Sequence, residues 1–313
     1  MKLKANGLRI EFEDTAIVDG ELDAKEAKKP VVLLIMGLGM QLVAWPPQMV
    51  QGLVDAGYRV IRFDNRDIGL STHLDALGKP NILWTGLKFK MGIMPKPPYT
   101  ISDMAQDALG VLDALEIDKA HIVGVSMGGM IGQRVAIAAP DRCLSLTSIM
   151  STSGARGLPK PKPEILRAIL RKPEGKNTQQ VIDHFVHVFR LIGSPTYPMP
   201  EEEVRNRVAI GVKRSYHPAG SLRQMLAIAT DITRAAQLSR ISTPTLVLHG
   251  LADPLVPFAC AQDTARRIPG SKLVAIPGMG HDLPPVPVAK MMQHMLTHFD
   301  ETNKPRKSKL KAA

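Results

Sequence analysis

The sequence has few aromatic residues, little cysteine and no long apolar run. Aromatic side chains make up 4% of the 313 residues, which disfavours the stacking platforms that bind single-stranded nucleic acid. The two cysteines, Cys143 and Cys260, fit buried free thiols in a reducing compartment better than a disulfide framework. No apolar run approaches the length of a membrane span, and residues 1–7 lack the apolar core of a signal peptide. We therefore expect a cytoplasmic protein without a membrane span.

Positive charge is in excess, but much of it lies at one end of the chain. The formal net charge is +11, and five of the cationic residues crowd the last ten positions. They are Lys304, Arg306, Lys307, Lys309 and Lys311. Because this segment has no apolar periodicity, we predict a disordered basic tail over residues 301–313. The rest of the chain is only mildly basic, so we expect no nucleic-acid partner.

Apolar runs alternate with helical patterns along most of the chain. The predicted strands are Val31–Ile35, Tyr58–Phe63, Ala120–Val123, Leu144–Met150, Thr245–His249 and Lys272–Ile276. The predicted helices are Pro47–Ala56, Ser102–Leu115, Phe258–Ile268 and one within Asp282–Phe299. A short antiparallel lead-in, Leu8–Phe12 with Ala16–Val18, precedes them. Such alternation with short loops predicts an α/β fold with a parallel sheet and helices on both faces.

One region breaks this alternation. Residues 151–240 contain a proline-rich loop, Leu158–Pro163, and helical stretches, but no run typical of a strand. We predict a helical cap over residues 151–240, inserted in a core formed by residues 1–150 and 241–300. We expect the cap to wall the substrate pocket with apolar helix faces, for example Val181, Phe185, Val188 and Phe189.

The most informative motif is Gly124-Val125-Ser126-Met127-Gly128. It stands between a predicted strand and a predicted helix, as a nucleophile elbow requires. Side chains two residues before and after Ser126 would collide with the neighbouring strand and helix, which explains both glycines. The motif predicts that Ser126 is a nucleophile.

A serine nucleophile needs a base and an acid that orients the base. His281 follows the last predicted strand in a glycine-rich loop, although a loop histidine at the surface is the common alternative. Asp253 follows the strand before it, although an aspartate before proline also forms ordinary turns. The strand end at 150–154 offers no rival carboxylate. The order Ser126, Asp253, His281 is that of an α/β hydrolase.

An oxyanion hole needs two main-chain N–H groups beside the serine. We assign them to Met127, at the start of the elbow helix, and to Leu38, in the turn after the first buried strand. Main-chain donors need no particular side chain, so an ordinary glycine turn is also compatible with Leu38.

Five motifs in the right order resemble α/β-fold hydrolases, and among them the esterase branch that includes aclacinomycin methylesterase. They are Ile35–Gly37 with Trp45-Pro46, Arg62–Ser71, Gly124–Gly128, Pro244–Val247 and Ile276–His281. The resemblance covers most of residues 5–300 and implies a mostly parallel eight-stranded sheet with this triad. Many members carry histidine before the oxyanion glycine. This chain has Met36 there, which implies a less polar pocket floor.

The predicted pocket is apolar. We expect Gly37, Met40, Trp45, Met150 and Met279 to line it, because they flank the serine in the predicted loops and thioethers form an adaptable lining. Core filling is the alternative for the methionines.

Other charged and ligating residues receive structural interpretations. Asp64, Arg66 and Asp67 could form a charged substrate site, but the resemblance implies a structural turn whose charges pair with one another, and we interpret them so. The pairs His184-x-x-His187 and His294-x-x-x-His298 have helix-face spacing but no accompanying carboxylate, so we predict no metal and no cofactor.

These residues predict a serine hydrolase that cleaves a small-molecule carboxylic ester, apolar or small-alkyl, through an acyl-enzyme. An acyltransferase, a perhydrolase or a C–C hydrolase would use the same triad, and a non-catalytic ligand-binding protein of this fold is a further alternative. The sequence leaves the oligomeric state open.

Overall fold

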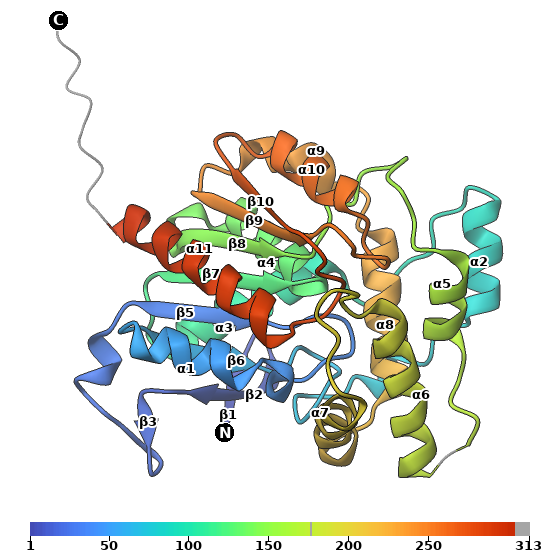
Figure 1. The fold of residues 1–313 in the computed structure, drawn as a ribbon, viewed down its shortest axis with the longest axis horizontal. Helices are drawn as coiled ribbons and strands as arrows, with labels where there is room; N and C mark the ends of the chain where they lie inside the picture. The colour runs from blue at the N-terminus through green and yellow to red at the C-terminus, as the bar shows by residue number, and fades with distance from the viewer. Residues whose placement is uncertain (176, 304–313) are drawn as a thin grey trace, which may run out of the picture.

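The computed structural model describes residues 1–175 and 177–303, which fold around an eight-stranded sheet (Figure 1). The strand order is β1-β2-β6-β5-β7-β8-β9-β10. In that order the strands span Lys2–Ala5, Leu8–Asp14, Arg59–Phe63, Val31–Ile35, Ala120–Val125, Cys143–Ile149, Thr245–Gly250 and Lys272–Ile276. The six strands β6, β5, β7, β8, β9 and β10 pair in parallel. β2 runs antiparallel to both of its neighbours, β1 and β6. The predicted α/β sheet is confirmed.

The N-terminal strands differ from the predicted lead-in. β2 pairs with β1 on one side and with β6 on the other, while β3 (Ile17–Val18) pairs with β4 (Glu21–Leu22) in a separate two-stranded sheet. The four residues of β1 lie at the sheet edge and are only partly buried, so they leave a short and weak apolar pattern.

Helices cover both faces of the sheet. α1 (Pro47–Asp55) and α11 (Pro285–Asn303) add buried side chains to one hydrophobic cluster, and α3 (Ile101–Ala114) and α4 (Met127–Ala138) add to the other. Alternate side chains of β5 enter the two clusters, so all five of its residues are buried. This explains why the strand reads as one continuous apolar run.

α10 (Phe258–Arg267) joins β9 to β10, and α11 extends to Asn303. Residues 301–303, predicted to belong to the tail, are therefore helical, and the rest of the predicted tail lies outside the described residues. Cys143 and Cys260 are buried free thiols, as expected. Among the described residues, no helix is both long enough and apolar enough to cross a membrane.

A helical insertion, residues 150–244, separates β8 from β9. Its described residues form helices and no strand. The helices are α5 (Pro163–Leu170), α6 (Thr178–Ile192), α7 (Glu201–Arg214), α8 (Pro218–Thr230) and α9 (Arg234–Gln237). Figure 1 shows α5 to α8 beyond one end of the sheet. α6 and α7 share a small apolar core, against which Phe185 and Phe189 pack. These two side chains, which we predicted to wall the pocket, therefore help to hold the insertion together.

Buried polar contacts tie the insertion to the sheet. Arg223 of α8 donates from Nε and Nη2 to the two carboxylate oxygens of Asp67, at 2.8 and 2.7 Å. Arg214 of α7 donates to Asp64 Oδ2 at 2.6 Å. Arg66 pairs instead with Asp107 of α3. The charged turn is thus structural, as predicted, but its charges pair with distant elements and not with one another.

Candidate active site

Ser126 stands at the sharp turn between β7 and α4. Its backbone adopts φ 55° and ψ −117°, in the left-handed half of conformational space that L-residues rarely adopt. A Cβ at Gly124 would lie 2.1 Å from the Gly128 carbonyl oxygen, and one at Gly128 would lie 1.9 Å from the Ile35 carbonyl oxygen. No larger residue fits either position, so the glycines allow the turn that presents the hydroxyl.

The structure brings the three predicted triad residues together. His281 Nε2 lies 3.0 Å from Ser126 Oγ, and His281 Nδ1 lies 2.7 Å from Asp253 Oδ2. Asp253 and His281 are only 5% and 8% exposed, so water screens their interaction weakly. These distances lie within hydrogen-bond reach for proton transfer from the hydroxyl to the imidazole.

The environment of Asp253 favours its ionised form. Burial raises the pKa of the carboxyl, but His281 and His249 outweigh this effect and hold the pKa well below its usual range. The Leu255 and Val256 N–H groups also donate to Oδ1, at 2.9 and 2.8 Å. Asp253 is therefore a fixed anion facing the imidazole.

The insertion holds the loop that carries His281. The His281 N–H donates to the Ile192 carbonyl oxygen at 2.7 Å, and the Gly280 N–H donates to Ser194 Oγ at 2.9 Å. Ser194 Oγ in turn donates to Asp282, whose carboxyl has a pKa raised by burial. Sequence reasoning missed Ser194 and Asp282. The only sequence signal was the position of Asp282 directly after His281.

The predicted oxyanion turn lies against the nucleophile. A Cβ at Gly37 would be 3.3 Å from Ser126 Cβ, and Asn65 Nδ2 donates to the Met36 carbonyl oxygen at 2.9 Å. From the insertion, Gln224 Oε1 accepts from the Gly39 N–H at 2.9 Å. The main chain that carries the Leu38 N–H is therefore fixed from both sides.

Met127 begins α4 directly after Ser126. Met127 is fully buried, so its side chain belongs to the core and the oxyanion role of its N–H stays a prediction. The start of a helix also carries a partial positive charge that favours a developing oxyanion.

The other predicted pocket residues divide into two groups. Gly37 contacts Ser126 as described, and Met40 is partly buried in the same turn. Trp45, Met150 and Met279 are at most 2% exposed and pack in the cluster between the sheet and α11. Their burial gives them a core role, and their contact with substrate stays a prediction.

One described cluster has metal-ligating atoms close together, although sequence reasoning did not find it. Atoms of His73, Asp75 and His217 lie within 4.8 Å of one another. The two imidazoles stack in parallel, with centroids 3.9 Å apart. An ion bound by both would lie near both ring planes, which this stack does not allow. His217 also already bonds the Asp67 carbonyl oxygen and Asp75 through its two nitrogens, so we assign no metal here.

The two histidine pairs considered in the sequence are also unsuited to a shared ion. His298 is buried and its Nε2 lies 3.3 Å from the Pro244 carbonyl oxygen, whereas His294 is exposed. His187 is exposed and lines a surface hollow.

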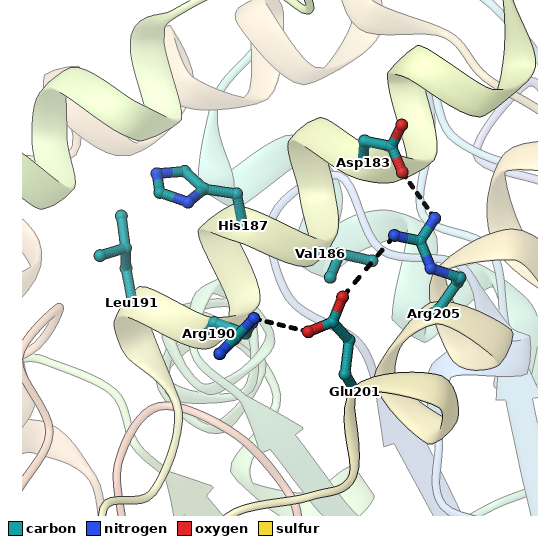
Figure 2. Close-up of a pocket in the computed structure, with 7 residues that line it drawn as sticks. All are labelled: Asp183, Val186, His187, Arg190, Leu191, Glu201 and Arg205. Atoms are coloured by element: carbon teal, nitrogen blue, oxygen red, sulfur yellow. Dashed lines mark hydrogen bonds and ion pairs between the residues drawn. The ribbon is translucent and has the colours of Figure 1, made fainter.

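That hollow, of about 370 Å³, lies on the insertion between α6 and α7 (Figure 2). Its lining residues are Asp183, Val186, His187, Arg190, Leu191, Glu201 and Arg205. Figure 2 shows Arg205 between Asp183 and Glu201, and Arg190 directed at Glu201. Because these charges satisfy one another and no triad residue is present, we assign no chemistry to the hollow.

Comparison with known proteins agrees with this geometry. The family description "alpha/beta hydrolase fold" matches residues 30–285. Rhodomycin D methylesterase of Streptomyces peucetius is 30% identical over 272 residues, covering 81% of this chain and 85% of that protein.

Two solved structures share the fold. The enol-lactonase of Burkholderia xenovorans LB400 superposes with a TM-score of 0.69 at 20% identity, covering 96% of this chain and 100% of that one. A meta-cleavage product hydrolase of Pseudomonas fluorescens IP01 reaches 0.73 at 19% identity, covering 97% and 98%. With its sheet, elbow and matching sequence, the chain belongs to the α/β hydrolase family.

Proposed function

We propose that the protein hydrolyses a carboxylic ester through an acyl-enzyme at Ser126. The observation that carries the proposal is the continuous hydrogen-bonded line from Ser126 Oγ through His281 to the buried Asp253. A serine hydroxyl in such a line can attack a carbonyl near neutral pH, which it cannot do alone.

In the proposed first step, Ser126 Oγ attacks the ester carbonyl while His281 Nε2 takes the hydroxyl proton. The Leu38 and Met127 N–H groups receive the developing oxyanion. His281 then returns the proton to the leaving alcohol, and the acyl group stays on Ser126. In the second step water attacks this acyl group while His281 Nε2 takes a proton from the water. The bond between the acyl carbon and Ser126 Oγ then breaks, the carboxylic acid leaves, and His281 returns the proton to Ser126 Oγ. Asp253 stabilises the imidazolium in both steps.

We propose a methyl or other small-alkyl ester of an apolar acid as the substrate class. The apolar character of the turn at 36–40 supports the acid part, and the similarity to a rhodomycin D methylesterase supports the small alcohol. An acyltransferase would need another acceptor to exclude water from the acyl-enzyme, and no observation favours one.

The test is a panel of p-nitrophenyl esters and of methyl esters of increasing acid size. We expect Ser126→Ala to remain folded and to lose turnover by at least roughly a thousandfold. A fluorophosphonate should label Ser126, and the exposed Ser242→Ala should serve as the matched control with unchanged turnover and labelling. Turnover retained in pure Ser126→Ala would refute the serine mechanism. Preferential product formation with added alcohol, in place of the acid, would point to acyl transfer.

A further inference from the structure

One helix of the sheet domain presents apolar side chains to solvent. α2 (Ile82–Lys90) and the segment that follows it expose Trp84, Leu87, Met91, Ile93 and Met94, each by 43–54%. Trp84 and Leu87 are one turn apart in α2, and Met91, directly after the helix, donates its N–H to the Leu87 carbonyl oxygen at 3.0 Å. The spacing i, i+3 and i+7 therefore places the three on one side of this segment. Large apolar residues gathered at one exposed site are typical of a surface that binds a protein or a membrane.

The charge around this face has one sign. Between Asp75 and Asp103 the sequence contains four lysines, at positions 79, 88, 90 and 96, and no acidic residue. Lys88 Nζ lies 5.7 Å from the centre of the Trp84 ring. Exposed tryptophan and leucine beside lysine are residue types that segments in a membrane interface use.

A second helix also exposes apolar residues. α5 exposes Leu166 and Leu170, which are one turn apart. Its charges are mixed, because Glu164 and Arg167 are both exposed and Arg171, just after the helix, pairs with Glu174. Figure 1 shows α2 and α5 at the same end of the molecule, beyond α8. Exposed apolar residues therefore lie on two helices at one end of the fold.

We propose that this face, formed by Trp84, Leu87, Lys88, Met91, Ile93, Met94 and Lys96 with Leu166 and Leu170, docks on an anionic phospholipid bilayer. Trp84, Leu87 and Met91 would enter the acyl boundary, while Lys88 and Lys96 would contact the lipid phosphates. The single sign of charge over residues 76–102 fits a uniformly anionic surface better than a protein partner, whose surface mixes both signs. The proposal does not depend on ester chemistry, because binding is measured without turnover.

The tryptophan content offers a specific probe. Trp84 is 54% exposed, and Trp45, the other tryptophan of the sequence, is 1% exposed. The probe vesicles contain phosphatidylcholine with roughly 30% anionic phosphatidylglycerol. We expect them to shift the tryptophan emission of the full chain to shorter wavelength. Brominated lipids in the same vesicles should quench that emission. In Trp84→Phe, binding should persist while the quenching is lost.

Variants distinguish the face from the basic residues elsewhere in the chain. Leu87→Ser with Met91→Ser should weaken vesicle binding by at least roughly tenfold, because apolar contact area is lost. The control pair is Ile210→Ser with Val286→Ser, at two exposed apolar positions on other helices, and it should bind as the unmodified chain does.

Three results would overturn the proposal. They are vesicle binding without quenching of Trp84, equal binding to pure phosphatidylcholine and to the anionic vesicles, and concentration-dependent dimers that Leu87→Ser with Met91→Ser disperses. The last result would assign the face to a second copy of the chain.

Discussion

Replacing Asp253 by asparagine tests the proposed triad at the residue that acts only through His281. The Leu255 and Val256 N–H groups both donate to Asp253 Oδ1. In Asp253→Asn they will keep the amide oxygen on their side, because an NH₂ group there would face two donors. The amide nitrogen must then face His281 Nδ1, where Oδ2 lies 2.7 Å away in the native protein.

The consequence is the wrong tautomer of the base. An amide nitrogen donates, so His281 Nδ1 must accept and the ring proton must sit on Nε2, 3.0 Å from Ser126 Oγ. A protonated Nε2 cannot take the serine proton, and the charge that stabilises the imidazolium is also lost. We expect kcat to fall by roughly 10⁴-fold, which corresponds to about 5 kcal/mol of transition-state stabilisation.

The assay is hydrolysis of the best p-nitrophenyl ester from the panel, with kcat and KM measured separately. Asp282→Asn is the matched control, because Asp282 is a neighbouring buried carboxyl whose partner Ser194 can donate equally well to an amide oxygen. We expect that control to lose less than about tenfold. If Asp253→Asn also stays within tenfold of the native rate, the acid lies elsewhere and our assignment is wrong.

Three further changes test the fold that supports the site. Burial lowers the pKa of His121 to about 4, so between that pH and about 6.5 the unfolded chain binds more protons, and stability falls as the pH drops. The native protein should therefore lose free energy of unfolding, measured in urea, between pH 7 and pH 4.5. In His121→Phe this loss should be smaller by about 2 kcal/mol, and an unchanged loss would contradict the buried neutral imidazole. Gly128→Ala should yield no folded protein, because its Cβ would meet the Ile35 carbonyl oxygen at 1.9 Å, whereas Gly86→Ala has open space and should fold normally. Arg223→Met leaves the Asp67 carboxylate buried without its cation and should cost about 3–5 kcal/mol in urea unfolding. Arg205, whose side chain is 35% exposed, offers the control. Arg205→Met should cost less than about 1 kcal/mol, and equal losses in the two variants would show that burial adds nothing to the Arg223–Asp67 pair.

The elbow and the buried strands could be predicted because their causes are local. The glycines around Ser126 and the apolar run of β5 follow from contacts within a few residues or from burial on both faces. The partners of Arg223, Gln224 and Ser194 could not be predicted, since each meets a residue more than 80 positions away. No periodic pattern marks such a contact before the chain has folded.

α2 was missing from the sequence prediction for a different reason. A helix is found in a sequence by an apolar stripe with a polar opposite face, and the apolar residues of α2 do not form a distinct stripe. Trp84 and Leu87 are exposed, so this helix is not specified by a face that packs on the core.

The contacts between the insertion and two loops of the candidate site bear on how this scaffold can be re-engineered. Gln224 holds the predicted oxyanion turn through the Gly39 N–H, and Ser194 holds the loop of His281 through the Gly280 N–H. Replacing the insertion alone would therefore change the groups that hold both loops. A chimera that exchanges residues 36–41 and 278–282 together with the insertion keeps both partners of each contact. The three segments are then one unit for changing the specificity of this scaffold.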